Sequence, residues 1–359
     1  MIAGRRRQER RGVLFVGQLD GWTVSRLRDA VAEAIGRADL DGLVRLVDAL
    51  CRERDWEGVV LLRERARAAL ERGLQLWPAA EYAEYRLALE APGARAGPVV
   101  VEGAGRFALG PLWEVAASSH PWAELALHIP AGPARSLAAH ERVMRGEDLT
   151  ADTTIDRGVL DIPLVLQAWE PGYAVAVFHA DKADFPSPPP PALHPRSLPP
   201  AGRAVEDDES VEALVDLARP WAEQSNGRVE AVLVEGETGA AIATLGYTEV
   251  AAAELDGAAA LAWMAWAGAS GGAYARRRGA AAGRLAAWWA AATLAGLDWP
   301  VEPAALGEAV TRMRWLAWQP PEFTSGWGLH LAGEVPAEGL AFAVAAADAR
   351  REEEGAKAG

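Results

Sequence analysis

A proline-rich and acidic stretch near the middle of the chain limits its fold more than any other feature. This stretch, "DFPSPPPPALHPRSLPPAGRAVEDDES", covers residues 184–210 and contains eight prolines. Proline has no backbone N–H and is excluded from helix interiors and central strands. We therefore expect an extended, mobile linker here, with a folded domain on each side. The run "PPPPALHP" also suits a polyproline II ligand, but no basic anchor accompanies a clear P-x-x-P core.

Before the linker, apolar residues recur at helical spacing. Those between residues 40 and 51 follow the i, i+3, i+4, i+7 pattern of a helix with one buried face. Asp39 and Asp55 are placed to cap two successive helices, and Pro78 to open another. The short connections are typical of antiparallel helical hairpins. We expect a mainly helical domain over residues 20–183.

Beyond the linker, the chain reads as strands in hairpins with helices set apart from them. We expect strands on either side of residues 236–239, over 248–255 and in "MRWLAWQ" and "GWGLHLAG", and a closing helix in "PAEGLAFAVAAADARREEE". Residues 211–350 would then be an α+β domain rich in tryptophan. The predicted fold class is α+β, predominantly helical, with a helical-hairpin N-terminal half followed by an α+β domain of antiparallel strands.

Several smaller segments complete the predicted organisation. Two short apolar runs around two glycines predict a β-hairpin over residues 98–110, inside the helical half. The alternating run "YAVAVFHA" predicts a strand shortly before the linker. Residues 1–19 are expected to be a basic tail with a short apolar segment, and residues 351–359 a charged tail.

The charge and composition of the chain narrow the function classes. The net charge of −14 disfavours nucleic acid as a partner, because nucleic-acid binders normally carry a basic field. No apolar run reaches the roughly 18 residues that a membrane-spanning helix needs. A single cysteine, Cys51, excludes a disulfide framework and a cysteine metal cluster within one chain. These features predict a soluble cytoplasmic protein.

The stretch from Trp266 to Trp289, "WAGASGGAYARRRGAAAGRLAAWW", holds most of the candidate site residues. It contains G-x-S-x-G, the turn that exposes a nucleophilic serine in α/β-hydrolases. Ser270, Asp298 and His330 follow in the chain order of that catalytic triad. The upstream strands look like hairpins rather than βαβ units, and little chain separates the serine from the acid. Both points argue against a serine hydrolase.

In the same stretch, Arg276-x-x-Gly279-x-Ala281 resembles the acyl-CoA pyrophosphate loop of the GNAT acetyltransferases. In that loop, backbone N–H groups at a helix N-terminus hold the diphosphate. The resemblance implies an acyl-CoA-dependent transferase that binds CoA or acetyl-CoA at Arg276, Gly279 and Ala281. It covers under a fifth of the chain, and extra residues separate the third strand from the motif.

Two further interpretations of the stretch compete with these. Its arginines can form an anion or phosphate clamp on an otherwise acidic protein. They are Arg276, Arg277, Arg278 and Arg284. Alternatively, small residues at every fourth position form one smooth face of a tightly packed helix. They are Ala275, Gly279, Gly283 and Ala287. Arg277 and Arg284 then point to water or pair with acids such as Glu249 and Glu254. We favour packing, and therefore predict no bound cofactor.

A second cluster of polar residues follows the strand predicted before the linker. His179, Asp181 and Asp184 form the pattern H-x-D-x-x-D, which brings borderline and hard metal ligands close together. A metal site at these residues needs a further ligand, and a solvated loop is the favoured interpretation.

The regions that include "GPLWEVAASSHPWAELALHIP" and "ARRRGAAAGRLAAWW" are similar to an actinobacterial family of hypothetical proteins. This resemblance implies no activity and transfers no catalytic residue. Because no catalytic constellation is favoured, we predict a binding protein whose helical N-terminal half contacts another protein. A homo-oligomer is compatible with this prediction, and neither nucleic acid nor a membrane is expected as a partner.

Overall fold

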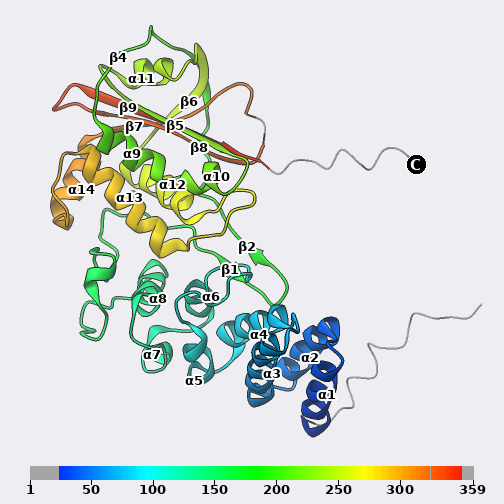
Figure 1. The fold of residues 1–359 in the computed structure, drawn as a ribbon. Coiled ribbons are helices and arrows are strands. Elements are labelled where there is room, and N and C mark those ends of the chain that lie inside the picture. Colours follow the sequence, from blue (N-terminus) through cyan, green and yellow to red (C-terminus); the bar gives the residue numbers. More distant parts are fainter. Residues whose placement is uncertain (1–23, 324, 350–359) are drawn as a thin grey trace, which may run out of the picture.

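The computed structural model describes residues 24–323 and 325–349, with the helical first half at one end and a large sheet at the other (Figure 1). The tails predicted over residues 1–19 and 351–359 lie outside the described residues. The first half consists of α1 (Val24–Gly36), α2 (Leu40–Arg52), α3 (Trp56–Ala68), η1 (Ala69–Arg72), α4 (Trp77–Glu90), α5 (Gly93–Ala96), η2 (Gly97–Val99), α6 (Leu112–Ser119), α7 (Trp122–Leu125), α8 (Pro133–Met144) and η3 (Arg157–Val159). A short hairpin of β1 (Val177–Phe178) and β2 (Ala183–Asp184) follows.

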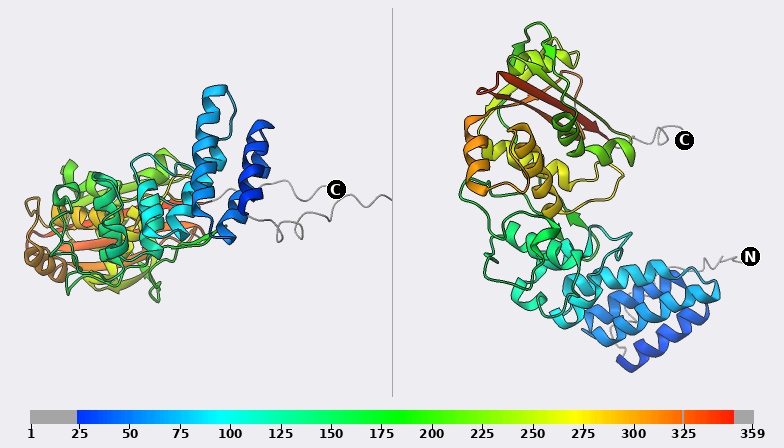
Figure 2. Two further views of the ribbon diagram at one scale, coloured as in Figure 1. Left: turned by 90° about the horizontal axis from the view of Figure 1, so that it is seen from below. Right: turned by 60° about the vertical axis from the view of Figure 1, so that its left-hand side comes forward.

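Local capping and one apolar face account for the first helices. The Asp39 carboxylate accepts a hydrogen bond from the N–H of Gly42 at 2.8 Å, and Asp55 accepts one from Gly58 at 3.1 Å. Both aspartates therefore cap the helices that the sequence assigns to them. The helices α1 to α4 pack side by side as a bundle (Figure 2). Fully buried residues of the predicted apolar face are Leu43, Val47 and Leu50.

The second half is built on an antiparallel sheet. Within the described residues this sheet has seven strands in the order β3-β6-β7-β8-β9-β5-β4, and every neighbouring pair is antiparallel. The strands are β3 (His194–Ser197), β4 (Arg203–Ala204), β5 (Arg228–Glu235), β6 (Glu249–Leu255), β7 (Arg314–Gln319), β8 (Trp327–Val335) and β9 (Leu340–Asp348). The α+β class, with a helical half before an antiparallel one, is confirmed.

Helices cover both faces of this sheet (Figure 1). They are α9 (Asp208–Asp216), α10 (Arg219–Glu223), α11 (Thr238–Thr244), α12 (Gly257–Ala269), α13 (Ala280–Leu294) and α14 (Pro303–Arg312). Phe342 and Val344 of β9 pack into the core that contains α12 and α13, whereas Ala341 and Ala343 pack into the smaller core under α11. The alternation follows from the two-residue period of a strand.

Three predicted elements are wrong. The alanine-rich segment expected to be the closing helix is β9, which pairs with β8 over its whole length and with β5 over residues 340–347. The second strand expected after Gly236 is the helix α11, which buries Ala241 and Ile242 against the sheet. Residues 98–110 contain η2 and turns rather than a hairpin. In β9, pairing with β5 and β8 outweighs the helix preference of alanine, whereas α11 follows that preference.

The segment predicted as a linker, residues 184–210, contributes to the sheet. Its strand β3 forms one edge, where Pro195 lies opposite Ala251, and its strand β4 forms the other edge. An edge strand bonds on one side only, which is why a proline is tolerated there. Of the strand predicted in "YAVAVFHA", the two residues of β1 are paired. No described helix is long and apolar enough to cross a membrane.

The helices α12 and α13 approach each other closely through glycine. A Cβ atom added to Gly283 would lie 2.1 Å from the carbonyl oxygen of Ala265, which is too close for any side chain. The predicted smooth helix face is therefore present at Gly283. It does not extend upstream as expected, because α13 begins at Ala280 and Gly279 is its N-cap residue.

Candidate functional site

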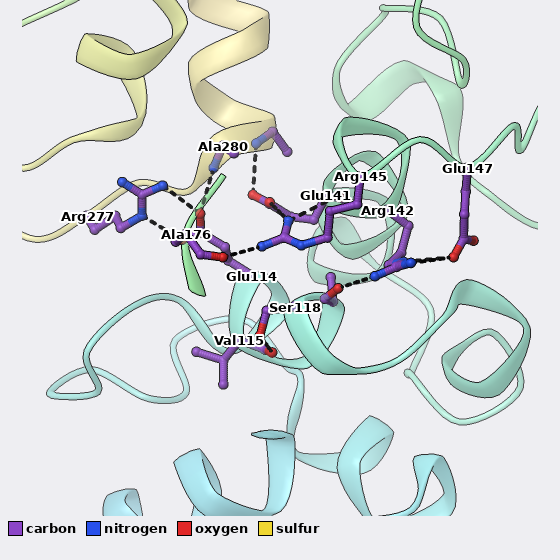
Figure 3. A network of polar contacts seen from close by, with 12 residues as sticks. Glu114, Val115, Ser118, Glu141, Arg142, Arg145, Glu147, Ala176, Arg277 and Ala280 are labelled. Atoms are coloured by element: carbon purple, nitrogen blue, oxygen red, sulfur yellow. Dashed lines mark hydrogen bonds and ion pairs between the residues drawn. The ribbon is translucent and has the colours of Figure 1, made fainter. Parts of the chain in front are cut away.

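The N-terminus of α13 lies against two glutamates of the helical half. The N–H of Ala280 donates to Glu114 Oε1 at 3.2 Å, and the N–H of Ala281 donates to Glu141 Oε1 at 2.8 Å (Figure 3). Both glutamate side chains are fully buried. Gly279 makes this approach possible, because its φ is +99° and a Cβ there would lie 2.9 Å from Glu141 Oε1.

Two arginines neutralise these buried carboxylates. Arg277 donates to Glu114 through Nε at 2.8 Å and through Nη2 at 2.7 Å, a two-bond ion pair. Arg145 donates to Glu141 Oε2 at 3.0 Å and to the carbonyl oxygen of Ala176 at 2.9 Å (Figure 3). Burial and the neighbouring Glu114 raise the pKa of Glu141 to about 7. The network joins the two halves of the chain.

This arrangement bears directly on the resemblance to a CoA loop. The N–H groups of Ala280 and Ala281 donate to carboxylates of the chain itself, so a helix N-terminus suited to an anion holds two internal anions. The strands of the described sheet are all antiparallel, whereas a CoA loop of that kind lies beside a splayed parallel pair. Arg276 and Arg278 donate to backbone carbonyl oxygens, those of Gly105 and Asp216.

Arg284 lies at the centre of a second buried network. It donates to Glu170 through Nε at 2.8 Å and through Nη2 at 2.7 Å, and both side chains are fully buried. Glu170 also accepts hydrogen bonds from Trp288 and Tyr173. Burial alone would raise the pKa of Glu170, but the bonds and charge of Arg284 hold it below its ordinary value. Arg277 and Arg284 pair with acids, as one of the two expectations had it, but the acids are Glu114 and Glu170 rather than Glu249 or Glu254.

The three residues of the hydrolase pattern are not joined by any hydrogen bond within the described part of the chain. Ser270 ends α12 rather than following a strand, and its Oγ accepts the N–H of Gly272 at 3.0 Å. The His330 ring on β8 packs against Trp318 and Phe323. Burial, together with Arg228, lowers the pKa of His330 to about 4. Asp298 lies in the loop between α13 and α14.

The residues of the predicted metal cluster lie in the β1–β2 hairpin. His179 Nε2 is 3.1 Å from Asp184 Oδ2, and Lys182 Nζ is 3.6 Å from Asp184 Oδ1. Asp181 lies at the turn between the strands, away from this pair of contacts. Among the described residues, no group of three or more histidine, cysteine, aspartate or glutamate side chains is placed to hold a metal ion.

A surface groove lies between α4, the loop after η2 and the β1–β2 turn. Its cavity volume is about 450 Å³. We call it the aromatic groove and define it by Trp77, Tyr82 and Tyr85 of α4 and by Phe107 and Leu109 of the loop. Phe107 is 68% exposed and Leu109 is 43% exposed. Exposed apolar side chains gathered around a cavity are typical of a binding surface.

The walls of the aromatic groove are held by defined contacts. The Tyr82 hydroxyl donates to Asp48 at 2.7 Å, and the Tyr85 hydroxyl donates to the carbonyl oxygen of His179. The rings of Trp77 and Phe107 lie with their centroids 4.7 Å apart. The N–H of Phe107 donates to Glu81 at 2.8 Å. The exposed loop is therefore fixed in place before any ligand arrives.

Two arginines of the second half support the same groove. Arg276 Nη2 donates to the carbonyl oxygens of Ala104, at 3.4 Å, and of Gly105, at 3.1 Å, in the loop that carries Phe107. The Arg277 guanidinium lies 4.8 Å from the ring centroid of Phe185, directly after the hairpin strand β2. The arginine run singled out in the sequence thus contacts the loop and the hairpin that border the groove.

Sequence reasoning missed the groove, although one signal was present. "GAGRFALG" places two large apolar residues in a glycine-rich loop, where burial inside a hairpin was assumed. A wider cavity of about 720 Å³ lies beside β6, β7 and α14. There Glu334 is engaged by Arg314 and by the N–H of Thr238, at the start of α11. The aromatic groove is the stronger candidate because its exposed side chains are apolar.

Three comparisons with known proteins complete the description. Residues 25–350 match DUF6183, which is described as a family of unknown function. Neither the comparison with curated proteins nor the comparison with solved structures finds a match.

Proposed function

Since the chain belongs to the DUF6183 family, a family of unknown function, we propose from its structure that it is a non-catalytic binding protein whose aromatic groove takes an apolar segment of another protein. The observation that carries this proposal is the exposure of Phe107 and Leu109 beside the cavity. Apolar side chains left in water gain free energy when a partner covers them.

The contacts of the candidate anion-binding groups support this interpretation. Arg277 pairs with Glu114, and Arg145 with Glu141, in a buried network that includes no residue lining the aromatic groove. The groove itself presents ring faces and a loop that is already ordered by Glu81 and Arg276. A preformed apolar surface needs little ordering when it binds, which favours recognition of a peptide segment. The acidic composition is in keeping with a cytoplasmic partner.

A selection of random peptides tests this proposal without knowledge of the natural partner. Nonapeptides displayed on phage would be selected on the full-length protein and counter-screened on a Phe107→Ser and Leu109→Ser double variant. Burying one phenylalanine side chain is worth roughly 1.5–3 kcal/mol. Enriched peptides should therefore lose about tenfold or more in affinity on the double variant.

A matched control distinguishes binding in the aromatic groove from nonspecific binding to exposed apolar side chains. Leu127 is 87% exposed after α7 and does not line the aromatic groove, so Leu127→Ser should leave the enriched peptides bound. Circular dichroism checks that each variant is folded. Selection that enriches no peptide, or only peptides that bind the double variant equally well, would overturn the proposal.

A further inference from the structure

We propose that the segment bound in the aromatic groove carries a lysine or arginine next to its apolar side chain. This inference rests on the proposed function, because it names the chemistry of the partner of the same groove. It follows from the charges and the ring faces that line the cavity.

The charged residues that line the aromatic groove are both acidic. They are Glu81 of α4 and Asp181 of the β1–β2 turn. Glu81 accepts one hydrogen bond, from the N–H of Phe107, through Oε2. Asp181 is exposed and has no hydrogen bond or ion pair with any described residue. A cationic side chain in the groove would meet both carboxylates, whereas an anionic one would be repelled by them.

The aromatic rings favour the same partner. A guanidinium or ammonium group is attracted to the face of a tryptophan, tyrosine or phenylalanine ring. The chain already uses this pairing beside the groove, because the Arg86 guanidinium lies 5.6 Å from the Tyr82 ring centroid. Burial and the bond to Asp48 raise the pKa of Tyr82 to about 12, so its ring stays neutral at physiological pH. The groove therefore combines apolar contact area, ring faces and negative charge.

Three synthetic nonapeptide pools test the inference. The pools share the same apolar positions and differ at the flanking positions, which carry lysine and arginine, serine and asparagine, or aspartate and glutamate. Binding to the full-length protein is measured by fluorescence polarisation at low and at high salt. We expect the basic pool to bind about tenfold more tightly than the neutral pool, with a preference that shrinks in high salt.

Two substitutions assign the preference to the groove. Glu81→Gln removes the charge but keeps a carbonyl oxygen to accept the N–H of Phe107, and Asp181→Asn changes a side chain that makes no hydrogen bond or ion pair with a described residue. The double variant should bind the basic pool no more than about threefold better than it binds the neutral pool. Glu102→Gln, in the same loop but outside the groove lining, is the matched control.

The possible outcomes separate the inference from the proposed function. Equal binding of the three pools overturns the inference and leaves an apolar binding groove standing. A preference for the basic pool that remains in the double variant also overturns the inference, because residues other than Glu81 and Asp181 would then recognise the positive charge. Binding by none of the pools overturns the proposed function itself.

Discussion

Arg276 donates a hydrogen bond at 3.1 Å to the carbonyl oxygen of Gly105, which lies 171 residues earlier in the chain. The loop that presents Phe107 is therefore held from one side by its own half, through Glu81, and from the other by the second half. Every residue that lines the aromatic groove belongs to the first half, but its loop has all of these contacts only when the second half is in place.

Removal of this brace should loosen the loop. Arg276→Ala leaves the carbonyl oxygens of Ala104 and Gly105 without their charged donor. A hydrogen bond to a charged group contributes on the order of 1.5 kcal/mol or more, so amide hydrogens of residues 101–110 should exchange about tenfold faster or more. Hydrogen-exchange mass spectrometry measures this. Arg312→Ala, at an exposed ion pair on α14, should leave the loop unchanged.

Glu114→Gln should destabilise the whole protein. The substitution leaves the Arg277 guanidinium, which is 10% exposed, without its carboxylate. Removing one partner of a buried ion pair costs about 3–5 kcal/mol, which urea unfolding can measure. Glu235→Gln breaks an exposed pair with Arg203 and should cost about 1 kcal/mol or less.

A further variant of the same pair checks the cause of the loss. Glu114→Gln combined with Arg277→Met removes both charges, so it should recover part of the stability lost in Glu114→Gln alone. If Glu114→Gln lowers the free energy of unfolding no more than Glu235→Gln does, the Glu114–Arg277 ion pair does not hold the two halves together.

Glu141 should make stability depend on pH near neutrality. Its folded pKa of about 7 lies above the ordinary 4.5, so the folded state binds the proton more tightly than the unfolded state does. The contribution of this group is complete below about pH 4.5 and is lost as the pH rises through about 7. Glu141→Gln removes this titration. The free energy of unfolding of the variant, relative to the natural chain, should rise by on the order of 3 kcal/mol between pH 4.5 and 8.

The readout for Glu141 is the change with pH, because the amide can bring a constant loss at every pH. Glu235→Gln, measured over the same range, serves as the exposed control. A difference between Glu141→Gln and the natural chain that stays constant with pH would contradict the assignment.

Gly283→Ala should lower the free energy of unfolding more than most glycine-to-alanine substitutions in this chain. Its Cβ would lie 2.1 Å from the carbonyl oxygen of Ala265 and 2.8 Å from the N of Ala269, so α12 and α13 must separate. We expect a loss of roughly 3 kcal/mol or more in urea unfolding. Gly36→Ala, at the end of α1 with no atom within 4 Å, should be neutral or slightly stabilising. Equal effects of the two substitutions would refute the close approach.

The parts of the fold that local chemistry decides could be predicted from the sequence. Asp39 and Asp55 cap helices because a side-chain oxygen reaches an N–H three residues away, and that spacing is visible in the sequence. The strand β9 could not be predicted in this way. Its alanines carry little strand preference, and it is a strand because β5 and β8 flank it.

Only one partner of each contact in the candidate site could be predicted from the sequence. The arginines and small residues of "ARRRGAAAGR" stand out, but Glu114, Glu141 and Glu170 lie more than 100 residues away from their partners. No local pattern connects such positions, and many surface glutamates look the same in the sequence. The groove was missed for a related reason, because α4, the loop and the β1–β2 turn meet only in the folded chain.

The network of ion pairs and hydrogen bonds at the start of α13 sets an order of events during synthesis. Glu114 leaves the ribosome well before Arg277, which follows it by 163 positions, and Glu141 precedes Ala281, whose N–H it accepts, by 140 positions. Until Arg277 is made, burial of the Glu114 carboxylate lacks the guanidinium that neutralises it. The first half of the nascent chain therefore matures late, when the second half is already being made.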